Sequence, residues 1–208
     1  MFVDEEIIKR KKLLRQMAEN AEREQVQTEN EMSVLDGTVS IYGEEFTFER
    51  RKIDETPFSI IIPVVIEKLD EETMNRMFPM GNDRLNAAYS SVRDLFNLTV
   101  NKTEVKVPQE HIVGFTDASA QMLDRMAPQV KILKKYTYEI EEIQIGIMEY
   151  LTMAMDGKAY NFQCIFPFDD GVLLISFSFH VKVKERMYNI IKQMLSTIHF
   201  EDTVNVIK

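Results

Sequence analysis

The chain has few of the residues on which metal-binding and catalytic motifs depend. Its 208 residues include one cysteine, three histidines and seven scattered glycines. One cysteine cannot complete a zinc site, and these glycines form neither a dinucleotide-binding fingerprint nor a phosphate-binding loop. The G-x-S-x-G motif of a nucleophile elbow is also absent. The sequence therefore predicts a protein that is not an enzyme and that uses no cofactor or metal.

The candidate side chains for such chemistry are separated along the chain. His111, His180 and His199 fall in three different predicted elements, and no two have the spacing of metal ligands. Cys164 lies on the inward face of a predicted strand, where a thiol behaves as a small buried hydrophobe. The carboxylates of neighbouring strands are predicted to be solvated: Glu139, Glu141, Glu142 and Glu149.

Long apolar runs and a basic surplus are missing as well. No stretch approaches the ~20 apolar residues of a membrane-spanning helix. The chain starts with acidic residues at 4–6, where a signal peptide would carry positive charge, and no apolar core follows. We therefore expect a cytoplasmic protein. The formal net charge of −9 argues against nucleic acid as a partner, because binding phosphates needs a basic face.

The first part of the chain is a charged segment that predicts a helix over residues 4–33. We expect residues 1–36 to form an N-terminal helical arm and residues 37–208 to form a single domain. A basic run in the arm can contact an anionic membrane surface or an acidic partner, or it is a solvated helix face balanced by nearby glutamates. That run consists of Lys9, Arg10, Lys11, Lys12 and Arg15.

Beyond residue 37 the pattern alternates between strands and helices. Short strands predominate, with a short helix after Asp70, a helix after Pro108 and a last helix over residues 184–197. Because most strands are linked as hairpins, we expect an α+β fold with a largely antiparallel, meandering sheet and helices packed on it. The helix after Pro108 is expected to face the core through Ile112, Phe115, Ser119, Met122 and Met126.

Two Asp-Gly pairs, Asp156-Gly157 and Asp170-Gly171, connect three alternating strands. Asp-Gly favours the type I′ turn of a two-residue hairpin, so we expect Met155 to face Lys158 and Asp169 to face Val172. These registers place the aromatic residues of the strands on one face of the sheet, including Phe162, Phe166 and Phe177.

The opposite face of this sheet combines apolar and small polar residues, which suits a binding surface. The alternative is that other helices, or the arm itself, cover this face in a three-layer arrangement. The candidate partner-binding residues on this face are Met148, Tyr150, Ile165, Leu174 and His180.

Several of these segments together resemble a known fold. The strand at 58–63, the helix before a meander, the Tyr160-x-Phe162 strand and the final amphipathic helix leading to Phe200 resemble the PsbP/Mog fold. This group includes the PsbP subunit of photosystem II, a Ran-binding nuclear import factor, DcrB-type bacterial proteins and the Eag chaperones of type VI secretion effectors. The resemblance covers about residues 38–200. It implies an α/β/α sandwich and a binding protein, and it offers no catalytic motif to transfer.

The sequence therefore leads to three functional hypotheses. The first is a non-enzymatic cytoplasmic binding module, a chaperone or adaptor for a client protein such as a secretion-system effector. The second is a structural or assembly subunit, in which the N-terminal helix pairs with a second copy or with a larger complex. The third is a small-molecule-binding protein with a pocket between sheet and helix.

Overall fold

The protein folds into two antiparallel sheets and a set of helices. The structure is a computed structural model that describes residues 33–41, 43–78, 85–91, 95–154, 157–168 and 171–201. The predicted N-terminal helix and its basic run lie outside these residues, except for Ser33 at the segment's end. The described part begins with a single short turn, η1 (Val34–Asp36), which Ser33 caps. Val34 is buried in the main core, so tightly packed structure begins before residue 37.

The larger sheet has seven strands in the order β4-β5-β6-β10-β9-β8-β7. All its neighbouring strands pair antiparallel, which confirms the predicted α+β fold with a largely antiparallel sheet. Its strands are β4 (Glu67–Lys68), β5 (Ala87–Ser90), β6 (Asn97–Lys102), β7 (Lys131–Ile140), β8 (Ile143–Ala154), β9 (Gly157–Phe168) and β10 (Gly171–His180).

The smaller sheet has four strands in the order β1-β2-β3-β11. It combines an early part of the chain with the segment that follows the last helix, because β11 pairs with β3. Its strands are β1 (Thr38–Ile41), β2 (Glu44–Lys52), β3 (Phe58–Pro63) and β11 (His199–Phe200).

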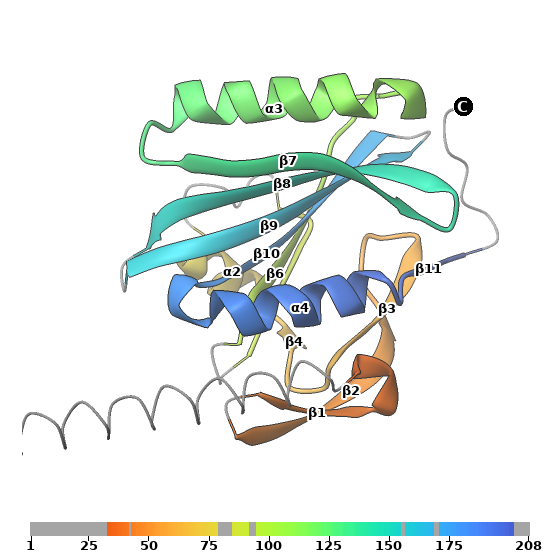
Figure 1. Ribbon diagram of the computed structural model, residues 1–208, viewed down its shortest axis with the longest axis vertical. Helices are drawn as coiled ribbons and strands as arrows, with labels where there is room; N and C mark the ends of the chain where they lie inside the picture. The colour runs from red at the N-terminus through yellow and green to blue at the C-terminus, as the bar shows by residue number, and fades with distance from the viewer. Residues whose placement is uncertain are drawn as a thin grey trace, which may run out of the picture.

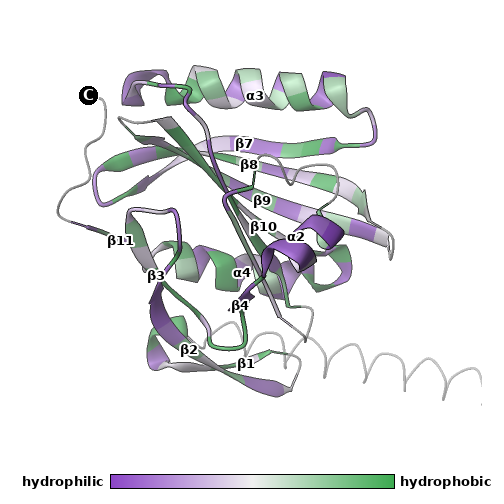
Figure 2. Cartoon of the chain, turned by 180° about the vertical axis from the view of Figure 1, so that it is seen from behind, coloured by the Kyte–Doolittle hydropathy of each residue, from purple (hydrophilic) through white to green (hydrophobic). Residues whose placement is uncertain are grey.

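Two helices lie on opposite faces of the larger sheet, as Figure 1 shows. Helix α3 (Ile112–Met126), which follows the turn η3 (Gln109–His111), packs on β7 and β8. Helix α4 (Lys184–Leu195), which follows η4 (Val181–Val183), covers the other face. Helix α2 (Glu71–Met77) buries none of its residues and is hydrophilic along its visible length in Figure 2. The predicted sandwich of helix, sheet and helix is confirmed.

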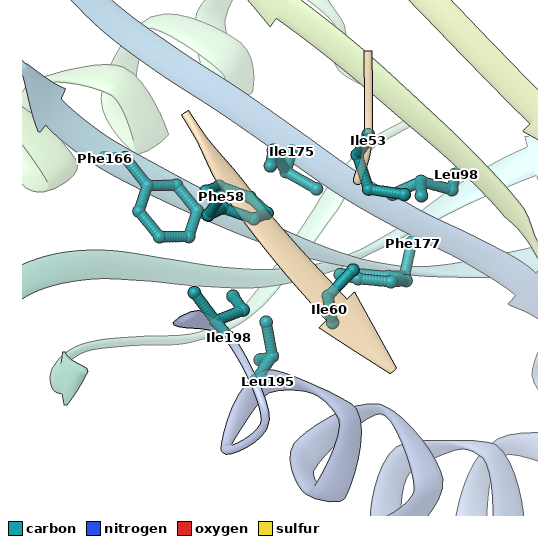
Figure 3. A pocket seen from close by; sticks show the side chains of 9 residues that line it. All are labelled: Ile53, Phe58, Ile60, Leu98, Phe166, Ile175, Phe177, Leu195 and Ile198. Atoms are coloured by element: carbon teal, nitrogen blue, oxygen red, sulfur yellow. The ribbon is translucent and has the colours of Figure 1, made fainter. Parts of the chain in front are cut away.

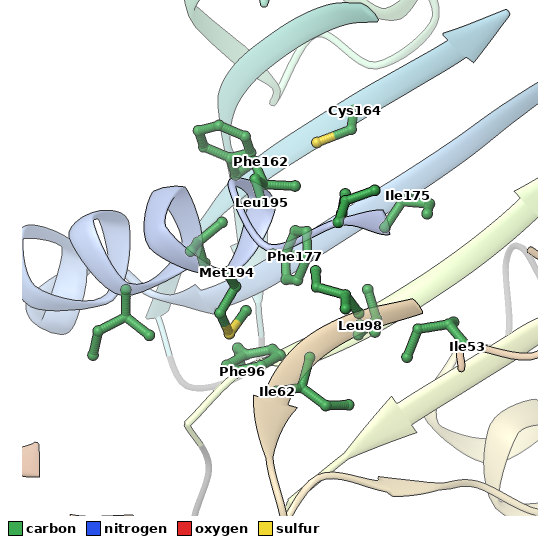
Figure 4. Packing of buried hydrophobic residues seen from close by; sticks show 14 of the residues in the cluster. Ile53, Ile62, Phe96, Leu98, Phe162, Cys164, Ile175, Phe177, Met194 and Leu195 are labelled. Atoms are coloured by element: carbon green, nitrogen blue, oxygen red, sulfur yellow. The ribbon is translucent and has the colours of Figure 1, made fainter. Parts of the chain in front are cut away.

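The main core fills the space between the larger sheet, α4 and the smaller sheet (Figure 4). Phe162, Phe166 and Phe177 are each at most 1% exposed, and all belong to this core. The smaller sheet contributes Phe58, whose ring centroid lies 5.3 Å from that of Phe166. The prediction that one face of the sheet is filled by aromatic rings is therefore confirmed. Cys164 is fully buried in the same core, and burial raises the pKa of its thiol.

The registers of the two predicted hairpins are wrong by two residues. Ala154 pairs with Gly157, and Phe168 pairs with Gly171, so each glycine starts a strand. Asp156 and Asp170 lie outside the described residues. Both glycines have a φ near +139°, a value that residues with side chains rarely adopt. A Cβ at Gly171 would also overlap the carbonyl oxygen of Thr103, so the glycine is needed in the strand.

This register error leaves the predicted faces unchanged. A shift of two residues keeps each side chain on its side of the sheet, whereas a shift of one would reverse every side chain. Leu151 accordingly pairs with Tyr160, and Phe177 pairs with Phe162, all on the face toward α4.

The predicted core stripe of α3 is confirmed at Ile112 and Phe115, which belong to or pack against the small core, and is wrong at Met122 and Met126. Its fully buried residues are Ile112, Thr116 and Ala120, whereas Met122 is 60% exposed and Met126 is 72% exposed. Thr116 and Ala120 are small, so they let the helix approach the sheet closely. Gly146 in β8 allows the same approach, because a Cβ there would overlap the hydroxyl oxygen of Thr116.

The turn between β7 and β8 connects the two sheets. Glu141 and Glu142 have φ values of 46° and 70°, which are unusual for residues with side chains. The Glu141 carboxylate lies 2.8 Å from His199 Nδ1 and accepts a 3.0 Å hydrogen bond from the backbone N–H of Phe200. The His199 contact and this hydrogen bond hold the pKa of Glu141 below its usual value. The carboxylate therefore joins the turn to β11 in its charged form.

The close approach of α3 predicts opposite effects for two glycine-to-alanine changes. Gly146→Ala should lower the free energy of unfolding by about 1–3 kcal/mol, because the added methyl overpacks the contact with Thr116. Gly114→Ala on the outer side of the same helix meets no atom within 4 Å and should stabilise the protein by about 0.5–1 kcal/mol. Urea unfolding measures both, and equal effects of the two changes would contradict the packing.

The link between the sheets predicts a stability difference that depends on pH. A carboxyl with a lowered folded-state pKa stabilises fully above its unfolded pKa, and this contribution is lost as the pH falls through the folded value. Glu141→Gln should therefore lower the melting temperature at pH 7, and the gap to the wild type should narrow below about pH 4. Glu142→Gln in the same turn is the control. A gap for Glu141→Gln that stays constant with pH would argue against the charged link.

Candidate functional site

A buried carboxylate joins β7, β8, β9 and α4. Glu149 in β8 is 0% exposed, and its side chain accepts hydrogen bonds from three tyrosines. The hydroxyl of Tyr136 donates over 2.9 Å and that of Tyr188 over 3.2 Å, and the hydroxyl of Tyr160 donates to the second oxygen. The prediction that Glu149 is solvated is wrong. It lies on the face toward α4, opposite Phe162, so its position follows from the register of the sheet.

These partners explain how a carboxylate is accommodated in the core. A buried charge is costly unless hydrogen bonds and an opposite charge compensate it. The Nζ atom of Lys134 lies 4.0 Å from Glu149, with a side chain that is 59% exposed. Burial raises the pKa values of Tyr136 and Tyr160, and their hydrogen bonds raise them further. The two phenols therefore remain neutral and act as hydrogen-bond donors.

Lysine ammonium groups lie over the tyrosine rings of the same cluster. Lys184 Nζ is 4.8 Å from the centroid of the Tyr160 ring. Lys134 and Lys192 approach the Tyr188 ring, at 5.6 and 5.7 Å. Cations in this position are attracted to the negative face of an aromatic ring. The cluster thus has a carboxyl group inside and lysine ammonium groups at its outer side.

A shallow groove runs beside this cluster, between β7 and α4. It encloses about 10 Å³, enough for a water-sized group. Tyr138 on its β7 side is 36% exposed, and Lys192 on its α4 side is exposed as well. The residues that line it are Tyr136, Tyr138, Ile147, Phe162, Lys192 and Leu195. An aromatic surface at this place can contact side chains that arrive from outside.

The outer edge of β7 borders the groove. β7 is the last strand of its sheet, and no other strand in the described part of the chain pairs with its second edge. Alternate residues of this ten-residue strand bond to β8, and those between them direct backbone N–H and C=O groups outward, where an added strand could pair with them. Three of these residues are lysines: Lys131, Lys134 and Lys135. Lys135 is paired at 2.5 Å with Asp117 of α3, on the other side of the sheet.

Helix α3 covers part of the surface that the sequence suggested for partner binding. Met148 is 2% exposed and Ile165 is 0% exposed, and both belong to the small core beneath α3. The open-face prediction is wrong for these two residues, and the alternative of a covering helix is confirmed. Tyr150 and Leu174 pack at the margin of the same core, and burial raises the pKa of Tyr150 to about 12.

His180, the last of the predicted partner-binding residues, makes a hydrogen bond that caps a short helical turn. Its Nδ1 accepts a 3.1 Å hydrogen bond from the backbone N–H of Lys182 and so caps η4. Its Nε2 lies close to the Cβ position at Gly157. A role in partner binding for Tyr150, Leu174 and His180 stays a prediction.

A second cavity, inside the main core, is shown in Figure 3. It also encloses about 10 Å³, and only apolar side chains line it. A space of this size holds at most one water molecule, and apolar walls offer such a water no hydrogen bonds. This cavity and the groove beside β7 are therefore both too small to enclose an organic ligand.

Two further properties concern the described residues as a group. No three or more of their histidines, cysteines, aspartates and glutamates are grouped so that they could hold a metal ion. No helix among them combines the length and the apolar composition that crossing a bilayer requires.

Comparison with known proteins relates the chain to others through its fold alone. No family model and no curated protein matches the sequence. The solution structure of cyanobacterial PsbP (CyanoP) from Synechocystis sp. PCC 6803 is similar over 74% of this chain and 92% of its own, with 10% identity and a TM-score of 0.56. PA94 of Pseudomonas aeruginosa, a protein of unknown function, aligns over 75% of this chain and 99% of its own, with 14% identity and a TM-score of 0.43. The chain has a PsbP-like fold.

The buried carboxylate predicts a large effect for one substitution. Glu149→Ala leaves three phenol hydroxyls without their acceptor and should lower the free energy of unfolding by about 3–5 kcal/mol. Glu139→Ala, at an exposed position in β7, is the control and should change it by about 0.5 kcal/mol or less. Urea unfolding compares the two. A loss below about 1 kcal/mol for Glu149→Ala would show that the cluster contributes little.

Proposed function

We propose that the protein is a non-enzymatic binding module that holds an extended segment of a client protein against strand β7. The observation that carries this proposal is the combination of an open strand edge with a groove and a helix beside it. Strand addition of this kind gains affinity from backbone hydrogen bonds and specificity from side chains that enter neighbouring pockets. The groove supplies such contacts through Tyr138 and Lys192.

The groove is supported by rigid structure, which favours binding at this place. Tyr136 lines the groove and Tyr188 lies beside it on α4. The hydroxyl group of each donates a hydrogen bond to the buried Glu149. This fixes the distance between β7 and α4 before a client arrives. A preformed site binds more tightly because less ordering is needed on association.

In the cell, the proposed role is that of a cytoplasmic chaperone or adaptor. The resemblance of the sequence to the Eag chaperones makes a secretion-system effector the first class of client to test. The PsbP-like fold is compatible with a binding module and does not identify the client.

The proposal predicts that client capture depends on the groove. Tyr138→Ala removes an exposed aromatic contact, and we expect it to reduce client recovery at least about tenfold, as the loss of about 1.4 kcal/mol would. Met126→Ala is the control, because Met126 is more exposed than Tyr138, at 72% against 36%, and lies on α3 at the opposite face of the sheet. The measurement is affinity purification of each full-length variant from the native cell, with quantitative mass spectrometry.

Two outcomes would decide against this function. If the same client is recovered equally with Tyr138→Ala and with the wild type, the groove is not its binding site. If light scattering shows that the purified protein is an oligomer and no client is recovered, an assembly role explains the open edge better.

A further inference from the structure

The charge of the molecule is unevenly distributed, and this bears on what the groove binds. The whole chain carries a formal net charge of −9. Strand β7 and the segment 181–195, which comprises η4 and α4, together contain seven basic and two acidic residues. These two segments are the walls of the groove. Lys135 faces α3 and Arg186 is buried, so the remaining five lysines of these segments are the basic groups that an acidic protein presents near its open strand edge.

Two of the three lysines and both tyrosines of β7 are arranged in order along one face. Lys131 pairs with Leu151, Lys134 with Glu149, and Tyr136 with Ile147, so all of these β7 residues lie on the side of α4. Tyr138 continues the series toward the end of the strand. The first half of this face is therefore basic and the second half is aromatic.

The ammonium groups are positioned to meet a partner. Lys192 lies over the Tyr188 ring on the α4 side of the groove. Within the described ranges, neither Lys131 nor Lys192 has a carboxylate within salt-bridge distance. Lys135 is already paired with Asp117 on the other face. Lys131 and Lys192 are thus the cations that an incoming acidic side chain can reach.

Lysines on an edge strand also prevent unwanted pairing between strands. This effect is compatible with binding, because the same charges discriminate between incoming strands. A second basic edge is repelled, whereas an acidic strand gains favourable pairs across the new ladder. Charge complementarity therefore selects the occupant.

We propose that the groove binds a partner segment that is extended, acidic in one half and apolar in the other, and that it adds to the sheet outside β7. Its acidic side chains face Lys131 and Lys192, and its apolar side chains contact Tyr136 and Tyr138. This inference rests on the proposed function and specifies the chemistry of the client segment.

The test uses the full-length protein and two fluorescein-labelled peptides of ten residues. One alternates Val and Thr in its first half and Glu and Thr in its second, and the other has Lys in place of each Glu. Fluorescence anisotropy should show at least about tenfold tighter binding of the acidic peptide, with an affinity that falls as salt is added. Hydrogen exchange should show slower exchange of the β7 amides when this peptide is bound.

Three variants locate the binding. Lys131→Gln and Lys192→Gln should each weaken the acidic peptide about threefold to tenfold, as expected for the loss of one favourable charge pair. Lys106→Gln removes the same charge from an exposed loop outside the groove and should leave the affinity unchanged. Melting temperatures confirm that all three variants remain folded.

Several results would overturn the inference. Equal affinity for the acidic and the basic peptide would refute the charge selection while leaving groove-dependent client capture intact. If the β7 amides that are not bonded to β8 already exchange slowly in the free protein, the chain itself or, where light scattering shows a dimer, a second copy occupies the edge. Failure of the proposed function is detected in the other experiment, the affinity purification: the client is then recovered equally with the wild type and with Tyr138→Ala.

Discussion

A fully buried carboxyl group needs hydrogen-bond partners from the protein, and in this fold the donors come from three separate elements. Glu149 in β8 receives the hydroxyls of Tyr136 from β7, Tyr160 from β9 and Tyr188 from α4. The Tyr136 and Tyr160 hydrogen bonds connect neighbouring strands, and the Tyr188 hydrogen bond connects α4 to the same carboxyl group, so the cluster helps to position α4 against the sheet. The geometry of the groove between β7 and α4 follows from this constraint.

The two faces of the larger sheet are covered in different ways. On the side of α4, large rings such as Phe162 and Phe177 fill the space and separate the helix from the strands. On the side of α3, Thr116 lies close to Gly146 and the buried Ala120 is also small, so the helix approaches the sheet closely. The first arrangement leaves a groove at the edge of the sheet, whereas the second covers Met148 and Ile165.

The sequence predicted the elements and the aromatic face well, because both depend on local periodicity. It failed on the register, since an Asp-Gly pair can form the turn itself or place its glycine at the start of a strand. Gly171 starts a strand, where the backbone of Thr103 lies so close that a side chain would not fit. Thr103 is distant in sequence, so the local pattern around Gly171 does not reveal this contact. The exposed Met122 and Met126 were misassigned for a similar reason, because the space beneath α3 depends on Gly146 of a different element.

The candidate site was not visible in the sequence because it depends on the order of the strands. Nothing in the residues of β7 indicates that the strand ends the sheet, and its lysines are also typical of an ordinary solvated strand. Glu149 was predicted to be solvated because its three donors lie 11, 13 and 39 residues away. Each of these facts requires the tertiary arrangement.

The tyrosine cluster has groups that acid-base catalysis employs, yet its geometry fits a structural role. Glu149 is 0% exposed, so a substrate cannot reach its carboxylate without local opening of the sheet or the helix. The pKa values of Tyr136 and Tyr160 are raised, which disfavours the phenolate that a general base would need. The exposed groups beside the cluster are the ring of Tyr138 and the ammonium group of Lys192, which suit the proposed contacts with a client. The cluster itself thus supports the groove from inside.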